Sequence, residues 1–485
     1  MKKSNLVLCA LAAMVTAGVL AGCGTTYYFA GRVLPPSGIA NRVLIAVQNP
    51  SSASKGALVF VDGYYDIRQS YNDKIPGFSI AGFSGALPVS IQNLPEERLG
   101  AVYSVGDGTF AQIDYTKENN TGNAAAFNGI STSAFISRNW RLAVAANQQL
   151  HVLTIVDKVN NRSYALGLPG VYRVSMNPGG TVVLAFVQNS NYAYYPRRLQ
   201  ASEATALAAY YQANGAWPQP YEDCEPKALP AMCLAQLQSP DNFNPTINTY
   251  YGAPLSFDRP IKAVWSADGS YAYVLNCGPE CGGNTSSVAI LPVAPLNIQS
   301  GQQSGSLPTQ ANLTVLPVPG GASNALVSST LLYVYGEQVM PDGLFGGHLT
   351  KIDTSNNTVG PAVSVSDSVP GATTKMILAD DNTLWVGGVR CTEGERYANA
   401  QPYGCLTMYN TSTDAVTMLE PFLGDLTGIA AVTSLHKVYV AQGGQVYIYS
   451  TKDGSAINNF YVTVQGTASD VAYMDALTDN NNTTY

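Results

Sequence analysis

From about residue 42 onward, apolar residues occur in short runs separated by turn-forming residues. In the clearest unit, an apolar run at 263–265 leads into the turn Asp268-Gly269, and a second run with alternating large residues covers 271–276. Asp-Gly between two such runs is a strong signal for a β-hairpin. A third run at 288–291 follows, so the unit predicts three consecutive antiparallel strands.

This unit recurs along the chain. Its second strand is found eight times, starting at Val43, Leu99, Leu142, Val182, Tyr271, Leu331, Thr383 and Lys437. Four-stranded units repeated every 40 to 60 residues or so are typical of β-propeller blades. The pattern therefore predicts an all-β chain that forms a single propeller, with eight blades by repeat count and seven as the alternative.

The two ends of the repeat region complement each other. The run at 470–474 reads as a first strand with no second strand after it, whereas the second strand at 43–47 has no first strand before it. We expect strands from both termini to complete one blade and close the ring.

One segment, 200–258, interrupts the repeat. It starts with a short helical pattern and continues as a loop rich in aromatic residues and proline. Aromatic side chains with polar tips suit the recognition of peptides or sugars. The candidate binding residues are Tyr210, Tyr211, Trp217 and Tyr221. The alternative is that these side chains only pack the insertion onto the ring.

The N-terminus has the features of an export signal. Lys2 and Lys3 precede an uncharged apolar stretch at 6–20, which is too short for an ordinary transmembrane helix. The sequence Leu20-Ala21-Gly22-Cys23 that follows resembles the lipobox of bacterial lipoproteins. The alternative is a plain secretory signal with an incidental cysteine.

The lipobox resemblance implies a division of the chain. Residues 1–22 would be removed as a signal peptide, Cys23 would carry lipid, 23–41 would form a tether, and 42–485 would be the propeller. It also implies a lipid-anchored protein of the bacterial cell envelope. Because Gly24 rather than Asp follows the cysteine, the outer membrane is favoured.

Six cysteines remain after Cys9 and Cys23 are set aside, and they form three local pairs. An even number in close pairs predicts disulfides in an oxidising compartment. The pairs are Cys224/Cys233, Cys277/Cys281 and Cys391/Cys405. A metal site is the rival interpretation, but Cys277 and Cys281 lack the spacing of zinc knuckles and have no histidine nearby.

Composition gives few signs of catalysis. Charged residues make up 12% of the chain and the net charge is −7, so there is no electrostatic case for nucleic-acid binding. His151, His348 and His436 fall at different positions of the repeat. No nucleophile elbow or phosphate-binding loop is present. We therefore predict no catalytic residues, no metal and no cofactor.

The unit at 271–276 also carries a family resemblance. Tyr273-Val274-Leu275-Asn276 differs at one position from the tetrapeptide of the YVTN propeller repeats of bacterial and archaeal surface proteins, and so resembles that family. This resemblance implies a propeller architecture and says little about function.

The function predicted from these features is a non-catalytic envelope lipoprotein. Its propeller would bind an envelope protein or an extracellular ligand, and its lipid would bind the membrane. The alternative is an extracytoplasmic hydrolase or lyase of the lactonase-like propeller type. A central channel lined by several ionisable residues would favour the enzyme, and an apolar or Asn/Thr-lined channel would favour binding.

Overall fold

The structure, a computed structural model, describes most of the chain between residues 34 and 478. The described residues are 34–67, 78–127, 129–198, 205, 209, 212–215, 249–251, 255–296, 313–339, 345–367, 374–389, 404–419, 424–457 and 461–478. Strands dominate the described residues, together with three short 3-10 helices, η1 (Pro95–Glu97), η4 (Gly278–Cys281) and η5 (Ala294–Leu296).

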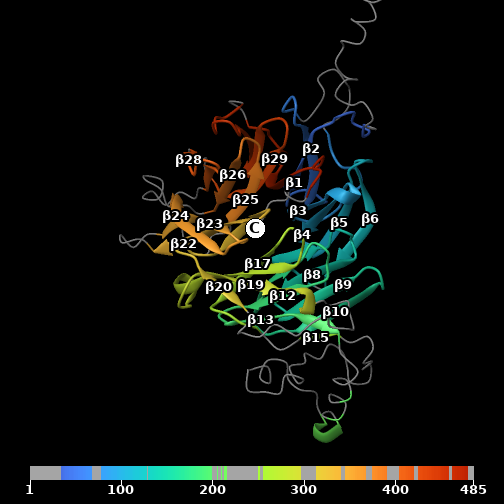
Figure 1. Cartoon of the computed structure of the whole chain (residues 1–485). Helices are drawn as coiled ribbons and strands as arrows, with labels where there is room; N and C mark the ends of the chain where they lie inside the picture. The colour runs from blue at the N-terminus through green and yellow to red at the C-terminus, as the bar shows by residue number, and fades with distance from the viewer. Residues whose placement is uncertain are drawn as a thin grey trace, which may run out of the picture.

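Eight antiparallel sheets follow one another around a ring, from the blue β1 and β2 to the red β29 (Figure 1). The first four blades are β32 (Thr467–Tyr473), β1 (Arg42–Gln48) and β2 (Gly56–Asp62); β3 (Pro88–Leu94), β4 (Leu99–Ser104), β5 (Thr109–Asp114) and β6 (Asn119–Ala126); β7 (Ser133–Ile136), β8 (Leu142–Asn147), β9 (Val152–Asp157) and β10 (Arg162–Gly167); and β11 (Val171–Met176), β12 (Val183–Val187), β13 (Tyr192–Tyr194) and β16 (Leu255–Ser256).

The remaining four blades continue in chain order. They are β17 (Pro260–Trp265), β18 (Tyr271–Asn276), β19 (Ser287–Pro292) and β20 (Thr314–Pro317); β21 (Asn324–Ser328), β22 (Leu331–Val339), β23 (Phe345–Asp353) and β24 (Thr358–Asp367); β25 (Thr374–Ala379), β26 (Thr383–Gly388), β27 (Cys405–Asn410) and β28 (Val416–Leu419); and β29 (Leu426–Val432), β30 (Lys437–Gln442) and β31 (Gln445–Ser450). In the first and eighth blades, isolated bridges at Ser79 and Val462 occupy the outer, fourth-strand position.

The predicted propeller and its repeat count are confirmed. Each of the eight predicted second strands coincides with an observed one to within a residue, so within the described residues the ring has eight blades and not seven. The predicted closure is also observed, because β32 pairs antiparallel with β1.

A buried ion cluster reinforces this closure. Arg42, only 3% exposed, lies on β1. Its guanidinium contacts Asp475, just after β32, at 2.7 Å and Glu118, in the second blade, at 2.9 Å. It also donates a hydrogen bond to the Tyr115 carbonyl at 2.6 Å. One side chain thus joins both ends of the described chain to the neighbouring blade.

The hydrophobic core lies between the blades. Along β18, Ala272 and Val274 pack with the preceding blade, whereas Tyr273 and Leu275 pack with the following one. This division follows from the two-residue period of a strand, which sends alternate side chains to opposite faces. Each sheet is therefore buried on both faces by its neighbours.

The first strands of the blades lie innermost. Seven of the eight neighbouring pairs of first strands contact each other closely: β32–β3, β7–β11, β11–β17, β17–β21, β21–β25, β25–β29 and β29–β32. Between β3 and β7, the Gln92 amide donates to the Ile136 carbonyl at 2.6 Å. First-strand side chains that do not enter the interblade core therefore face the central channel.

The predicted insertion leaves the fourth blade between its third and fourth strands. The chain departs after β13 and returns in β16, which pairs with it. At the base of the insertion, β14 (Pro196–Arg198) pairs with β15 (Thr249–Tyr251).

Candidate functional site

One residue of each first strand lies at a common level around the channel. In each blade, this residue pairs with a residue of the second strand, the one that comes directly after the apolar residue at the centre of that strand. In ring order they are Asp470, Ser90, Ser133, Arg173, Lys262, Asn324, Lys375 and Gly428. All but Gly428 are polar, and we call this set the channel ring.

β-bulges help to set the direction of these side chains. In five blades an extra residue immediately precedes the ring position. A bulge adds one unpaired residue, bends the strand and redirects the side chains beside it. The extra residues are Val89, Tyr172, Ile261, Thr427 and Ser469.

Lys375 and Asp470 form a buried ion pair across the ring. Their amine and carboxylate lie 3.5 Å apart, with side chains 8% and 1% exposed. Burial lowers the pKa of Lys375 and raises that of Asp470, while their mutual attraction opposes both shifts. Gly428 lies between their blades, and a Cβ there would come 2.5 Å from the Asp470 carboxylate, so the absence of a side chain makes room for the pair.

Lys262 is a buried lysine of a different kind. Its residue is 7% exposed, and its amine donates a hydrogen bond of 2.6 Å to the side-chain oxygen of Asn324. Among the described residues it has no carboxylate partner. Burial, then the positive charges of Arg173 and Lys375, hold the pKa of Lys262 well below its usual value. The ring therefore contains one compensated lysine and one uncompensated lysine.

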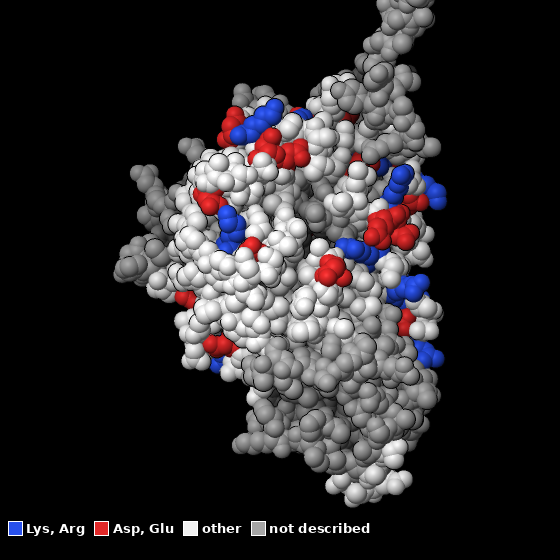
Figure 2. Space-filling model, in the orientation of Figure 1, with Lys and Arg blue, Asp and Glu red and all other residues white. Residues whose placement is uncertain are grey.

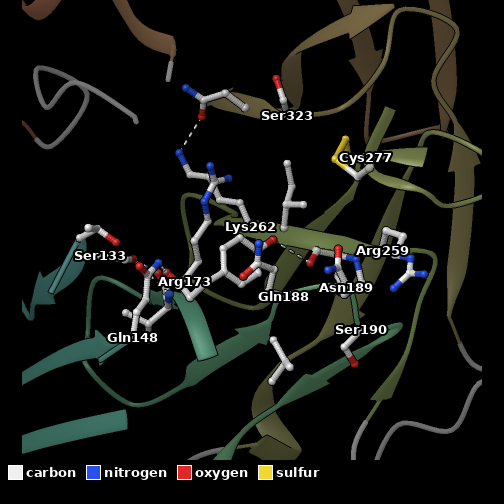
Figure 3. Close-up of a pocket in the computed structure, with 18 of the residues that line it drawn as sticks. Ser133, Gln148, Arg173, Gln188, Asn189, Ser190, Arg259, Lys262, Cys277 and Ser323 are labelled. Carbon is white, nitrogen blue, oxygen red and sulfur yellow. Dashed lines mark hydrogen bonds between the residues drawn. A yellow bond between two sulfur atoms is a disulfide. The ribbon is translucent and has the colours of Figure 1, made fainter. Parts of the chain in front are cut away.

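Arg173 adds a second uncompensated cation. It is partly exposed, and within the described residues its guanidinium forms no ion pair and contacts the ring of its neighbour Tyr172 at 5.5 Å. Figure 3 shows the side chains of Arg173 and Lys262 extending towards the same region. The Arg173 guanidinium and the Lys262 amine, whose protonated form a neighbouring anion would stabilise, together form a ready site for an anion.

These side chains border a cavity of about 570 Å³ at one end of the channel. Around them lie hydroxyl and amide groups that can donate and accept hydrogen bonds, among them Ser133, Gln148, Gln188, Asn189 and Ser323 (Figure 3). Glu280 and Glu337 also border the cavity. One carboxylate oxygen of Glu280 is buried and has no hydrogen-bond partner among the described residues.

The disulfide predicted between Cys277 and Cys281 lies at this cavity. The bond is present, it closes the turn between β18 and β19, and both cysteines are part of the cavity wall. Cys405 is also disulfide-bonded, while Cys391, its predicted partner, lies outside the described residues.

The other predicted site residues lie outside the described residues. These are the lipidation site Cys23, the pair Cys224 and Cys233, and the aromatic residues Tyr210, Tyr211, Trp217 and Tyr221. Their proposed roles remain predictions.

The three histidines do not converge on the channel. His151, His348 and His436 belong to three different blades. His436 instead contacts Asp381 at 2.8 Å in a turn region. In the part of the chain that the structure describes, no group of three His, Cys, Asp or Glu side chains could hold a metal ion.

Arg173 and Lys262 were not among the residues singled out by sequence reasoning. The search of the sequence for channel residues considered the three histidines, whereas the cluster observed at the channel is mainly basic. The sequence does show a charged residue near the start of a predicted first strand, as in the segment 172–176, and this charge could have indicated the site.

On the face shown in Figure 2, acidic and basic side chains of the described residues are intermixed and form no extended patch of one sign. None of the described helices has the length and apolar character needed to span a membrane.

Comparison with known proteins gives matches in structure only. No protein-family model and no curated protein sequence matches the chain. The resemblance to YVTN repeats therefore remains a prediction. The structure is similar to dihydro-heme d1 dehydrogenase NirN in complex with DHE, with 11% identity over 92% of this chain and 78% of that chain, and a TM-score of 0.48.

Two further solved structures are similar at a comparable level. Hydrazine synthase of Kuenenia stuttgartiensis has 9% identity over 79% of this chain and 99% of that chain, with a TM-score of 0.44. The periplasmic gluconolactonase of Pseudomonas aeruginosa has 13% identity over 89% of this chain and 98% of that chain, with a TM-score of 0.40. Similarity at this level carries no information about function.

Proposed function

We propose that this protein is a binding propeller of the cell envelope whose central channel holds a small organic anion. The observation that supports this function best is the pair Arg173 and Lys262. Both side chains border one cavity, and neither has an anionic partner among the described residues.

Arg173 and Lys262 are costly to keep side by side without a ligand. Burying an amine with one hydrogen bond and no counter-ion is costly, and two neighbouring cations repel each other. An anion bound between them would remove both penalties, since charge-assisted hydrogen bonds to carboxylate or phosphate groups are among the strong ones. The surrounding Ser, Asn and Gln side chains would orient the rest of the ligand.

The envelope location rests on the N-terminal sequence. A signal at 1–22 followed by a lipidated Cys23 would place the propeller outside the cytoplasm on a lipid anchor. The disulfide between Cys277 and Cys281 agrees with an oxidising compartment. The aromatic insertion would serve as a separate surface for a protein partner.

The test is binding of simple anions to the purified protein. Acetate, inorganic phosphate and sulfate are titrated while thermal unfolding is followed. At least one should raise the melting temperature, and Arg173→Gln should weaken that effect by roughly 10- to 100-fold in concentration, since a hydrogen bond to a charged group contributes about 1.5–3 kcal/mol. Arg162→Gln, which alters an exposed arginine on β10, is the matched control. An equal response in both variants would contradict the proposal.

An enzymatic role is the second candidate, because the channel contains ionisable groups. An amine whose pKa is lowered by burial, as in Lys262, can serve as a base or nucleophile towards a carbonyl group. By the criterion stated from the sequence, these ionisable residues favour an enzyme. We retain binding because Lys375 and Asp470 are paired with each other, and because no histidine lies among the described residues that border the cavity. Turnover of a simple lactone by the wild-type protein, lost in Lys262→Met, would reverse this preference.

A further inference from the structure

The channel continues from the basic cavity into a second cavity of different character. This second cavity, of about 280 Å³, lies along the same five inner strands, towards their C-terminal ends. The two cavities share Ser90, Ala134, Phe135 and Lys262 as wall residues. Lys262 therefore stands at the junction between them.

The wall of the second cavity is mainly apolar. Phe135, Met176, Trp265, Leu326 and Val327 contribute to it. Phe135, Trp265 and Val327 are only partly buried, so they retain surface that a ligand could cover.

Several polar groups of this wall already have partners within the protein. The Gln92 side chain both donates to and accepts from the backbone of Ile136. The Ser175 hydroxyl accepts the Ala263 N–H at 3.1 Å. The Arg138 guanidinium lies 3.8 Å from Glu96. A ligand in this cavity would therefore meet mostly apolar surface.

We propose that the ligand of this channel is an amphipathic carboxylate. Its carboxylate group would lie at Arg173 and Lys262, and its apolar tail would extend along Phe135, Met176 and Trp265. This inference rests on the proposed anion-binding function and adds the class of ligand. The order of the groups follows from the fold, since the inner strands run from the basic cavity to the apolar one.

A chain-length series separates the tail from the head. The full chain, purified in detergent, is titrated by calorimetry with acetate, butanoate and hexanoate. Each fully buried methylene should strengthen binding roughly fourfold. Hexanoate, with four more methylenes than acetate, should therefore bind on the order of 100-fold more tightly, because burial of the chain will be incomplete.

Two variants assign the effect to the channel. Trp265→Ala should reduce the advantage of hexanoate over acetate at least several-fold, while Tyr271→Ala should not change it. Tyr271 is an aromatic control, 43% exposed on the adjacent strand and not part of either cavity wall. Arg173→Gln should weaken all three carboxylates together.

The outcomes distinguish this inference from the function on which it rests. Equal affinity for the three carboxylates, lost in Arg173→Gln, would overturn the amphipathic ligand and leave the anion site intact. A chain-length effect that persists undiminished in Trp265→Ala would place the tail elsewhere, and carboxylate binding that is not weakened in Arg173→Gln would place the head elsewhere; either result would overturn it as well. If no carboxylate and no inorganic anion binds, both the inference and the proposed function fail. The wild-type series does not depend on any variant folding correctly.

Discussion

The two buried lysines of the channel ring should respond in opposite directions to the same substitution. Lys262 and Lys375 occupy equivalent positions and are buried to a similar degree, at 7% exposure each. Lys375 is paired with Asp470, whereas Lys262 has a single hydrogen bond to Asn324. Methionine is similar in length to lysine and carries no charge, so it isolates the contribution of the amine.

For Lys262→Met the losses are small. The variant gives up one hydrogen bond, which contributes about 0.5–1.5 kcal/mol net. The oxygen of Asn324 still accepts the Ala325 N–H at 2.9 Å, so it is not left without a partner. The gain is relief from burying an amine without a counter-ion, a cost of several kcal/mol before compensation. We expect Lys262→Met to stabilise the fold by roughly 1–3 kcal/mol.

For Lys375→Met the balance is reversed. The substitution leaves the carboxylate of Asp470, 1% exposed, without its counter-ion. Removing one partner of a buried pair typically costs about 3–5 kcal/mol. Urea unfolding monitored by circular dichroism measures both variants, with midpoints compared at unchanged m-values. A loss of more than about 1 kcal/mol in Lys262→Met would show that Lys262 supports the fold rather than a ligand site.

Three further predictions follow from the closure, the titration of the channel and the N-terminus. Arg42→Met should destabilise the ring by about 3–5 kcal/mol, because the buried Glu118 and the half-buried Asp475 would lose their counter-ion. Urea unfolding measures this, and a change below about 1 kcal/mol would argue against the closing cluster. Because the pKa of Lys262 is lowered in the folded state, lowering the pH below the ordinary value of 10.5 protonates this lysine in the unfolded chain first, and the wild-type protein loses stability. The stability advantage of Lys262→Met over wild type should therefore be larger at pH 7 than near pH 10.5. A difference that does not change with pH would contradict the lowered pKa. Cys23→Ser should move the protein from the membrane to the soluble fraction, and unchanged fractionation would exclude the lipid anchor.

The architecture could be predicted because each blade repeats the same local signals. The second strands are buried on both faces and so appear as apolar runs, and turns such as Asp268-Gly269 separate them from their neighbours. The closure of the ring was predictable because the segment 470–474 lacked a partner in sequence.

The channel was harder to predict, since its residues come from eight distant segments. Which residue of a first strand belongs to the channel ring depends on β-bulges. A bulge shifts the strand by one residue and leaves little trace in the sequence. Arg173 follows the bulged Tyr172 and Lys262 follows the bulged Ile261, so a strict two-residue alternation misassigns their direction. The pairing of Lys375 with Asp470 across Gly428 depends on the closed ring and could not be read from any one repeat.

The claim that an anion occupies the channel is tested most directly by diffraction. Crystals of the wild-type protein are soaked in selenate, and anomalous difference density is measured at the selenium edge. We predict a peak within hydrogen-bonding distance of both the Arg173 guanidinium and the Lys262 amine. Selenate peaks elsewhere on the molecule, with none between these two side chains, would contradict it.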